Sequence, residues 1–135
     1  MLARSGHADD TIVVLTADHG EGLGECPACI GHGDNLTGMM AIEVPLAIRL
    51  PRALFPDAAP HVVDTWASQL DLYPTVLSLL GEPPVPTHEG RALLDARGAV
   101  LPPEKDRTFF VETGEWLWVF WDQVRRQWFV QAEVD

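Results

Sequence analysis

Basic side chains are scarce in this sequence of 135 residues. Nine Lys and Arg residues stand against 20 Asp and Glu residues, which gives a formal net charge of −11 at pH 7. A protein that binds nucleic acid needs a basic face to displace counterions, and one that binds anionic lipid needs clusters of Lys and Arg. The charge therefore argues against nucleic acid and against an anionic membrane surface as partners.

Long apolar runs are absent as well. A helix that crosses a bilayer needs about 18 continuous apolar residues, and no stretch of this sequence approaches that length. We therefore predict no membrane segment in this chain. Residues 1–7 lack the apolar core of a secretory signal peptide, and we expect residues 1–8 to be a frayed lead-in. Neither absence is informative if the chain is part of a longer protein. The hydrophobic content of 47% is enough for the core of one domain.

Candidate nucleophiles are few. None of the three serines has the sequence context of a Ser-His-Asp arrangement. The two cysteines, Cys26 and Cys29, are separated by two residues inside a glycine-rich loop. Three interpretations stay open for them: a small zinc site shared with His32, a redox disulfide, or two loop cysteines without a role.

The most informative segment begins with an apolar run at residues 11–15, which predicts a buried strand. Asp18 and His19 follow where the chain leaves that strand, so both side chains can face one crevice. Asp offers an anionic oxygen and His an imidazole nitrogen, a pair suited to a divalent cation. Glycines at positions 20, 22 and 24 keep side chains out of the approach, as a bound anion would require. We therefore predict half of a metal site at Asp18 and His19.

A second histidine belongs to the same prediction. His32 lies between Gly31 and Gly33, which leave no neighbouring side chains to bury it and free the backbone to turn back over the site. We expect His32 to point into the cleft of Asp18 and His19, as a donor to a bound anion or as a further ligand.

The pattern along the chain predicts an α/β fold. Residues 44–50 form a second apolar run typical of a buried strand, and residues 62–69 alternate loosely, as in an edge strand. Asp71 is placed to cap a helix over residues 72–80, because its carboxylate can accept from the first-turn amides. Gly81 is placed to end that helix.

Other polar residues have simpler expected roles. Arg49 is suited to hold an anion, but we expect it instead to form an ion pair with one of the many carboxylates. His88 is expected to be a surface residue without a role. For Glu21 two roles stay open: a partner that orients His19, or an exposed loop carboxylate. Residues 36–42 are expected to form a helical turn.

The pattern changes after a proline pair near residue 102. Three short strands of an antiparallel meander are predicted over residues 107–112, 116–121 and 127–133. Four of the five tryptophans fall in this region, which favours aromatic packing between strands, with a carbohydrate-binding or partner-binding face as the alternative. We predict two domains, residues 1–100 and 101–135.

Several segments follow one another in an order and at distances typical of one enzyme family. They are Asp18-His19-Gly20-Glu21 with Leu23-Gly24-Glu25, Gly31-His32-Gly33, Val44-Pro45-Leu46 with Ile48-Arg49 and Pro51, Asp71-Leu72-Tyr73-Pro74-Thr75-Val76-Leu77 with Leu79-Leu80-Gly81, and Glu89-Gly90-Arg91 with Leu93-Leu94. Together these segments resemble the sulfatases of the alkaline-phosphatase superfamily. The resemblance covers about residues 9–112.

The resemblance implies a partial alkaline-phosphatase-like mixed sheet with flanking helices, and hydrolysis of a sulfate or phosphate ester at a divalent metal (Ca, Mg, Mn or Zn). In such enzymes the metal lies between acidic residues of the N-terminal part and an Asp-His or Asp-Asn pair of the later part. Asp18 and His19 match the later pair as metal ligands. His32 matches a position that contacts the ester oxygens, which makes it the candidate catalytic residue.

The early acidic ligands and the nucleophile of the family have no counterpart in this sequence. The resemblance therefore implies the C-terminal portion of a catalytic domain, inactive alone, with an N-terminal half as a candidate partner. A phosphoethanolamine or phosphoglycerol transferase of the same superfamily is the nearest alternative. A truncated, non-catalytic binding module is the alternative from a different class.

Overall fold

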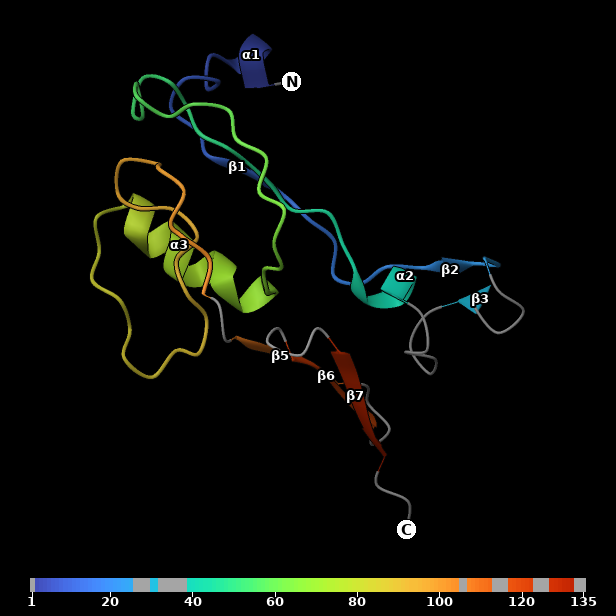
Figure 1. Ribbon diagram of the computed structural model, residues 1–135. Helices are drawn as coiled ribbons and strands as arrows, with labels where there is room; N and C mark the ends of the chain where they lie inside the picture. The colour runs from blue at the N-terminus through green and yellow to red at the C-terminus, as the bar shows by residue number, and fades with distance from the viewer. Residues whose placement is uncertain are drawn as a thin grey trace. The chain divides into compact units, whose positions relative to one another are not determined.

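Figure 1 shows the chain as a mixed α/β protein whose elements are short. The computed structural model describes residues 2–25, 30–31, 39–104, 107–112, 117–122 and 127–132. The helices are α1 (Leu2–Ser5), α2 (Met39–Ile42) and α3 (Leu72–Leu79), the last preceded by a 3-10 turn at Gln69–Asp71. The strands are β1 (Val13–Leu15), β2 (Gly22–Leu23), β3 (Ile30–Gly31), β4 (Ala47–Arg49), β5 (Thr108–Glu112), β6 (Leu117–Asp122) and β7 (Gln127–Ala132). The longest of the described helices, α3, has eight residues, so none of these helices could cross a membrane.

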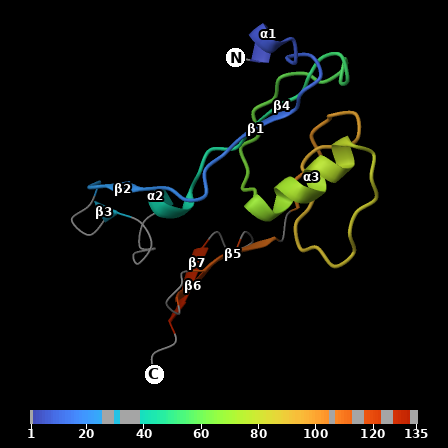
Figure 2. The same ribbon diagram turned by 180° about the vertical axis from the view of Figure 1, so that it is seen from behind.

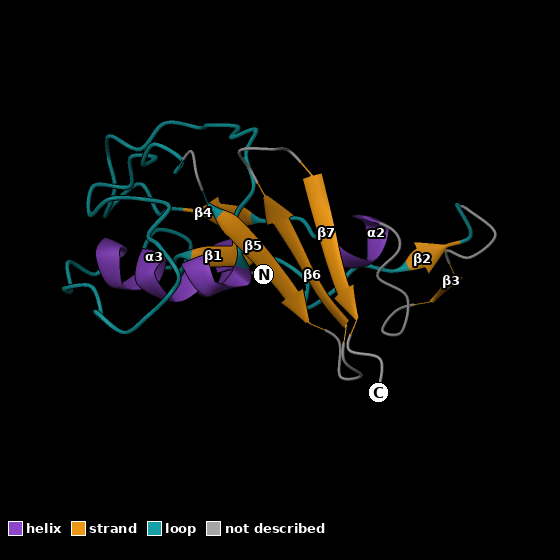
Figure 3. Cartoon of the chain, turned by 60° about the horizontal axis from the view of Figure 1, so that its bottom comes forward, coloured by secondary structure: helices purple, strands orange, loops and turns teal. Residues whose placement is uncertain are grey.

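Within the described residues the strands form three small sheets. β1 pairs with β4, and the two run side by side in both ribbon views (Figures 1 and 2). β2 pairs antiparallel with β3, with Gly22 opposite Gly31. β5, β6 and β7 form an antiparallel sheet in chain order, which Figure 3 shows from a tilted direction. The predicted meander is therefore confirmed, and each strand begins and ends within one residue of the predicted positions.

The chain divides into two compact units. The first unit consists of Met1–Val13 and Ile48–Pro103, and the second of Val14–Ala47 and Glu104–Asp135. The predicted domain division between residues 100 and 101 stays a prediction.

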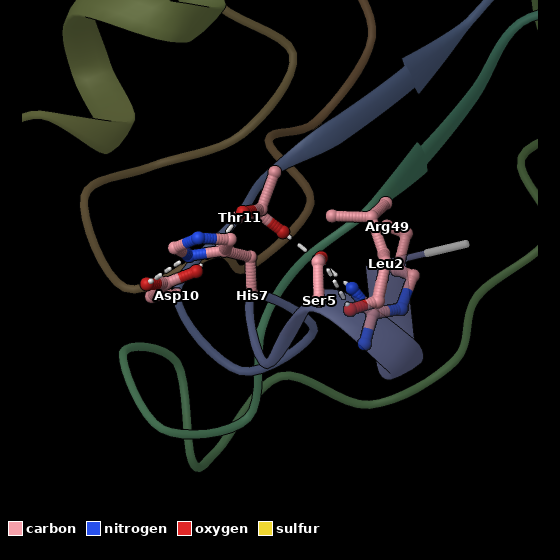
Figure 4. A network of polar contacts seen from close by, with 6 residues as sticks. All are labelled: Leu2, Ser5, His7, Asp10, Thr11 and Arg49. Carbon is pink, nitrogen blue, oxygen red and sulfur yellow. Dashed lines mark hydrogen bonds and ion pairs between the residues drawn. The ribbon is translucent and has the colours of Figure 1, made fainter.

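The N-terminal segment of the first unit is held in place by a polar network (Figure 4). The guanidinium group of Arg49 donates to the carbonyl oxygen of Ala8 at 2.8 Å and to that of Thr11 at 3.5 Å. Nearby, His7 Nδ1 lies 3.1 Å from Asp10 Oδ2. Two predictions were wrong here: residues 1–8 contain α1 rather than a frayed lead-in, and Arg49 binds main-chain carbonyls rather than a carboxylate.

Asp71 is the N-cap residue of α3, as predicted, but its carboxylate makes no capping hydrogen bond to the first-turn amides of that helix. Ser68 caps the preceding 3-10 turn, its hydroxyl accepting from the Leu70 N–H at 3.2 Å. Asp71 is fully buried, and its carboxylate accepts from the main-chain N–H groups of Ser68 at 2.8 Å and Arg91 at 2.9 Å. Because a buried carboxylate must be hydrogen-bonded to be tolerated, these contacts fix the loop at residue 91 against the helix start.

The same loop is held along α3 by a second set of contacts. The Thr75 hydroxyl donates to the Asp71 carbonyl at 2.6 Å and accepts from the Leu93 N–H at 2.9 Å. His88, expected to have no role, accepts from the Gly90 N–H at 2.9 Å. The centroid of its ring lies 5.1 Å from the centroid of the Tyr73 ring. The helix and the loop that follows it therefore form one hydrogen-bonded assembly.

Apolar burial is limited in the described part of the chain. Its buried apolar side chains are those of Ala41 in the second unit and of Pro51, Phe55, Pro74 and Leu79 in the first. The prediction of a buried strand at residues 11–15 was wrong in its burial, because Leu15 is 61% exposed. The predicted edge strand was also wrong, since residues 62–69 contain no strand.

Candidate metal site

The predicted metal ligands lie in the second unit, in the segment between β1 and β2. Asp18 and His19 are both exposed. The predicted catalytic residue His32 lies outside the described residues, as do Cys26 and Cys29, so the interpretations of these three residues stay predictions.

The side chains of the two predicted metal ligands, Asp18 and His19, approach each other. His19 Nε2 lies 3.7 Å from Asp18 Oδ2, while Asp18 Oδ1 accepts from the His19 main-chain N–H at 3.1 Å. Two ligand atoms about 2.0–2.2 Å from one zinc ion are separated by at most about 4.4 Å, so the pair fits a shared ion. The geometry thus brings together the two residues that the sequence pairs.

A hydrogen bond on the opposite side of the ring decides which nitrogen of His19 could bind a metal. His19 Nδ1 lies 2.8 Å from the carbonyl oxygen of Gly20. A carbonyl only accepts, so Nδ1 carries the hydrogen, and in the neutral ring Nε2 holds the lone pair. Histidines that bind metals are oriented in this way by a partner on the second nitrogen.

The charges around His19 favour its protonated form. The Gly20 carbonyl, followed by the Asp18 carboxylate, raises the pKa of His19 above its ordinary value. The charge of Glu21, which is exposed, acts in the same direction. A proton therefore competes with a metal for Nε2 up to a higher pH than at an ordinary histidine.

Gly20 packs directly on α2, a contact that sequence reasoning missed. Its N–H donates to the Ala41 carbonyl at 3.0 Å, and a Cβ atom at this position would lie 1.8 Å from the Met40 carbonyl oxygen. The sequence suggested that glycine here clears the approach of an anion, whereas the structure shows that it allows close approach of α2. The only sign of this contact in the sequence is the glycine itself, and a glycine does not show which element packs against it.

The strand β3 lies beside β2, which directly follows the segment of Asp18 and His19. Gly31, the residue before His32, pairs with Gly22, four positions after Asp18. Among the residues that the structure describes, no three His, Cys, Asp or Glu side chains are grouped closely enough to hold a metal. The described part of the site therefore offers two donors.

A comparison with protein-family models matches residues 1–82 to the sulfatase family. The chain belongs to the sulfatase family. The matched part of this sulfatase-family chain includes Asp18, His19 and the whole of α3, and it ends before β5. The resemblance inferred from the motifs is thereby confirmed at the level of the family. No solved structure matches the chain significantly.

Proposed function

We propose that this chain is the C-terminal portion of a metal-dependent sulfatase-type catalytic domain and supplies two ligands of its metal site. The observation that carries the proposal is the Asp18–His19 pair, with Oδ2 and Nε2 3.7 Å apart and Nδ1 bound to the Gly20 carbonyl. The pair lies within the segment that matches the sulfatase family. Zinc takes four ligands and calcium six to eight, so two donors require others from elsewhere.

The roles of the two ligands follow from their chemistry. Asp18 would contribute a negative charge and His19 a neutral nitrogen, a mixed donor set that favours zinc or manganese over calcium. Once bound, a divalent cation would polarise a sulfuryl or phosphoryl oxygen of the ester. The Gly20 carbonyl would keep His19 in the tautomer that leaves Nε2 as the ligand atom.

His32 is proposed to donate a hydrogen bond to the ester oxygens. The pairing of Gly31 with Gly22 supports this role, because it ties the residue before His32 to the ligand segment. A donor aimed at an oxygen that gains charge lowers the barrier to ester cleavage.

Metal binding by the purified chain tests the ligand assignment. In a Cys26→Ser/Cys29→Ser background, Mn²⁺ and Zn²⁺ are titrated into the chain and into its Asp18→Ala and His19→Ala variants, with calorimetric detection. Loss of an outer-shell partner weakens metal binding about 10–100-fold, so loss of a ligand is expected to cost at least about tenfold. Asp64→Ala and His61→Ala, exposed residues of the first unit, serve as matched controls. Equal affinity of all five proteins would contradict the proposal.

Catalysis is tested by complementation. The chain alone is expected to turn over neither an aryl sulfate nor an aryl phosphate, because groups that act as a unit lose nearly all activity when some are removed. Addition of the N-terminal half of a sulfatase-family catalytic domain is expected to restore turnover. The ratio of the turnover rates on the aryl sulfate and the aryl phosphate then distinguishes a sulfatase from a phosphoryl-transfer enzyme. Metal-dependent turnover by the chain alone would show that the site is complete.

A further inference from the structure

The contact between the ligand segment and α2 has a consequence for the metal ligand His19. We infer that Gly20 is a positioning residue, whose main chain is clamped by α2 and in turn fixes the tautomer and direction of the His19 ring. The inference rests on the proposed function in that His19 Nε2 is taken as a metal ligand. Figure 1 shows α2 beside the segment that joins β1 to β2.

The need for glycine at position 20 is steric. A Cβ atom there would lie 1.8 Å from the Met40 carbonyl oxygen and 2.9 Å from the Met40 carbonyl carbon, both atoms of the main chain. Main-chain atoms of a helix cannot swing aside as the end of a flexible side chain can. Gly20 is absent from the glycines with positive φ, so its backbone conformation is open to other residues, and the contact alone excludes them. Gly24 is the opposite case, with φ of +98° and nothing within 4 Å of an added Cβ.

Hydrogen bonds hold the main chain on both sides of the Gly20 Cα. The N–H donates to the Ala41 carbonyl at 3.0 Å, and the carbonyl accepts from His19 Nδ1 at 2.8 Å. Glycine has the greatest backbone freedom of any residue, so an unclamped Gly20 would let its carbonyl turn away from the ring. The bond to Ala41 and the packing on Met40 remove that freedom.

The fixed carbonyl matters because the His19 side chain is 46% exposed. A half-exposed neutral imidazole exchanges its hydrogen between the two nitrogens through water, and only one tautomer leaves Nε2 able to bind a metal. An acceptor held at Nδ1 selects that tautomer before the metal arrives. Ordering of the ring in advance also reduces the entropic cost of binding.

The test compares Gly20→Ala with Gly24→Ala, which strains the backbone without striking a neighbour, in the full chain. A synthetic peptide of residues 1–25 is ligated at Cys26, so that His7 and His19 are the only ¹⁵N-labelled histidines. Nitrogen shifts of the His19 ring, measured without metal at a pH where the ring is neutral, report the tautomer. The unchanged chain and Gly24→Ala are expected to show the Nδ1–H form. Gly20→Ala is expected to show a mixture and to bind Mn²⁺ about tenfold more weakly.

A second variant removes the clamp without adding bulk. The same synthetic peptide can carry an ester oxygen in place of the Gly20 N–H, which deletes the hydrogen bond to Ala41 and keeps the shape. This variant tests the role of Gly20 even if Gly20→Ala does not fold. It is expected to shift the tautomer of His19 in the same direction as Gly20→Ala. An Nδ1–H tautomer retained in the ester variant overturns the inference. Tautomer shifts as expected in a chain whose Mn²⁺ affinity does not depend on Asp18 would support the clamp and refute the proposed metal site.

Discussion

Two aspartates of the family-matched region, Asp18 and Asp71, are used in opposite ways. Asp71 is fully buried, and its two carboxylate oxygens accept from main-chain N–H groups that lie 3 residues before it and 20 residues after it. The Asp18 side chain is 88% exposed; one oxygen accepts from the next N–H and the other faces His19 Nε2. A carboxylate surrounded by main-chain donors stabilises the fold, whereas one that faces solvent beside an imidazole nitrogen is available to a ligand.

The largest expected effect is on stability at Asp71. Asp71→Ala leaves the partly buried N–H groups of Ser68 and Arg91 without their acceptor, and each such loss costs about 1–3 kcal/mol, so we expect about 3 kcal/mol in total. Urea denaturation measures this loss. Asp18→Ala, an exposed change, is expected to stay within about 0.5 kcal/mol. Equal destabilisation by the two substitutions would remove the distinction between the aspartates.

Metal is expected to stabilise the chain through the Asp18–His19 pair. At a free Mn²⁺ concentration about 100 times the Kd, binding to the native state adds about 2.7 kcal/mol to the free energy of unfolding. At the same Mn²⁺ concentration, an affinity about tenfold weaker lowers this gain to about 1.4 kcal/mol in Asp18→Ala, and a larger loss of affinity lowers it further, as measured by thermal unfolding with and without Mn²⁺. A variant of the first unit, His61→Ala, is expected to keep it, and loss of the gain there would place the metal elsewhere.

Substitutions at Gly90 and Gly20 are expected to distinguish the loop that follows α3 from the segment of Asp18 and His19, with smaller effects. A Cβ at position 90 would lie 1.9 Å from the Leu70 carbonyl oxygen, so Gly90→Ala forces the loop away from the 3-10 turn that precedes α3. We expect it to cost about 1–3 kcal/mol of stability, as overpacking does, with no change in Mn²⁺ affinity. Gly20→Ala is expected to change Mn²⁺ affinity in addition to stability. Identical effects of both substitutions on affinity would argue that neither contact is specific to the ligand segment.

Metal binding is expected to depend on pH through His19. The Gly20 carbonyl and the Asp18 carboxylate raise the pKa of His19, so protons displace metal up to a higher pH than at an ordinary histidine. Below that raised pKa, Mn²⁺ affinity is expected to fall about tenfold for each pH unit. Calorimetric titrations between pH 5 and pH 8, a range chosen on the ordinary histidine pKa of about 6.5, measure this slope. A slope that persists in His19→Ala would assign the proton to another group.

The smallest expected effect concerns the N-terminal network of the first unit. The hydrogen bond from His7 holds the pKa of Asp10 below its usual value, so this carboxylate favours the folded form above its unfolded pKa and loses that preference as pH falls through the lowered pKa. In His7→Ala, NMR titration is expected to show the pKa of Asp10 returning toward its usual value. Asp9, its exposed neighbour, serves as the internal control.

The sequence by itself determined several of the local elements and the family. The strands β5 to β7 and the helix over residues 72–79 follow hydrophobic patterns with recognisable boundaries, so both were predicted closely. The Asp18-His19 segment was recognisable because a carboxylate beside an imidazole offers the donor types that a divalent cation prefers. These features depend on neighbours in the chain, which is why a pattern could show them.

Only the tertiary structure decided which distant groups meet. Arg49 holds the carbonyls of Ala8 and Thr11 from 41 and 38 positions away, and Asp71 binds the N–H of Arg91 20 positions further on. Such main-chain partners leave no trace in side-chain patterns, because every non-proline residue carries the same N–H and every residue the same C=O. The contact of Gly20 with α2 is of the same kind: the sequence shows a glycine, and only the fold shows the carbonyl that a side chain would strike.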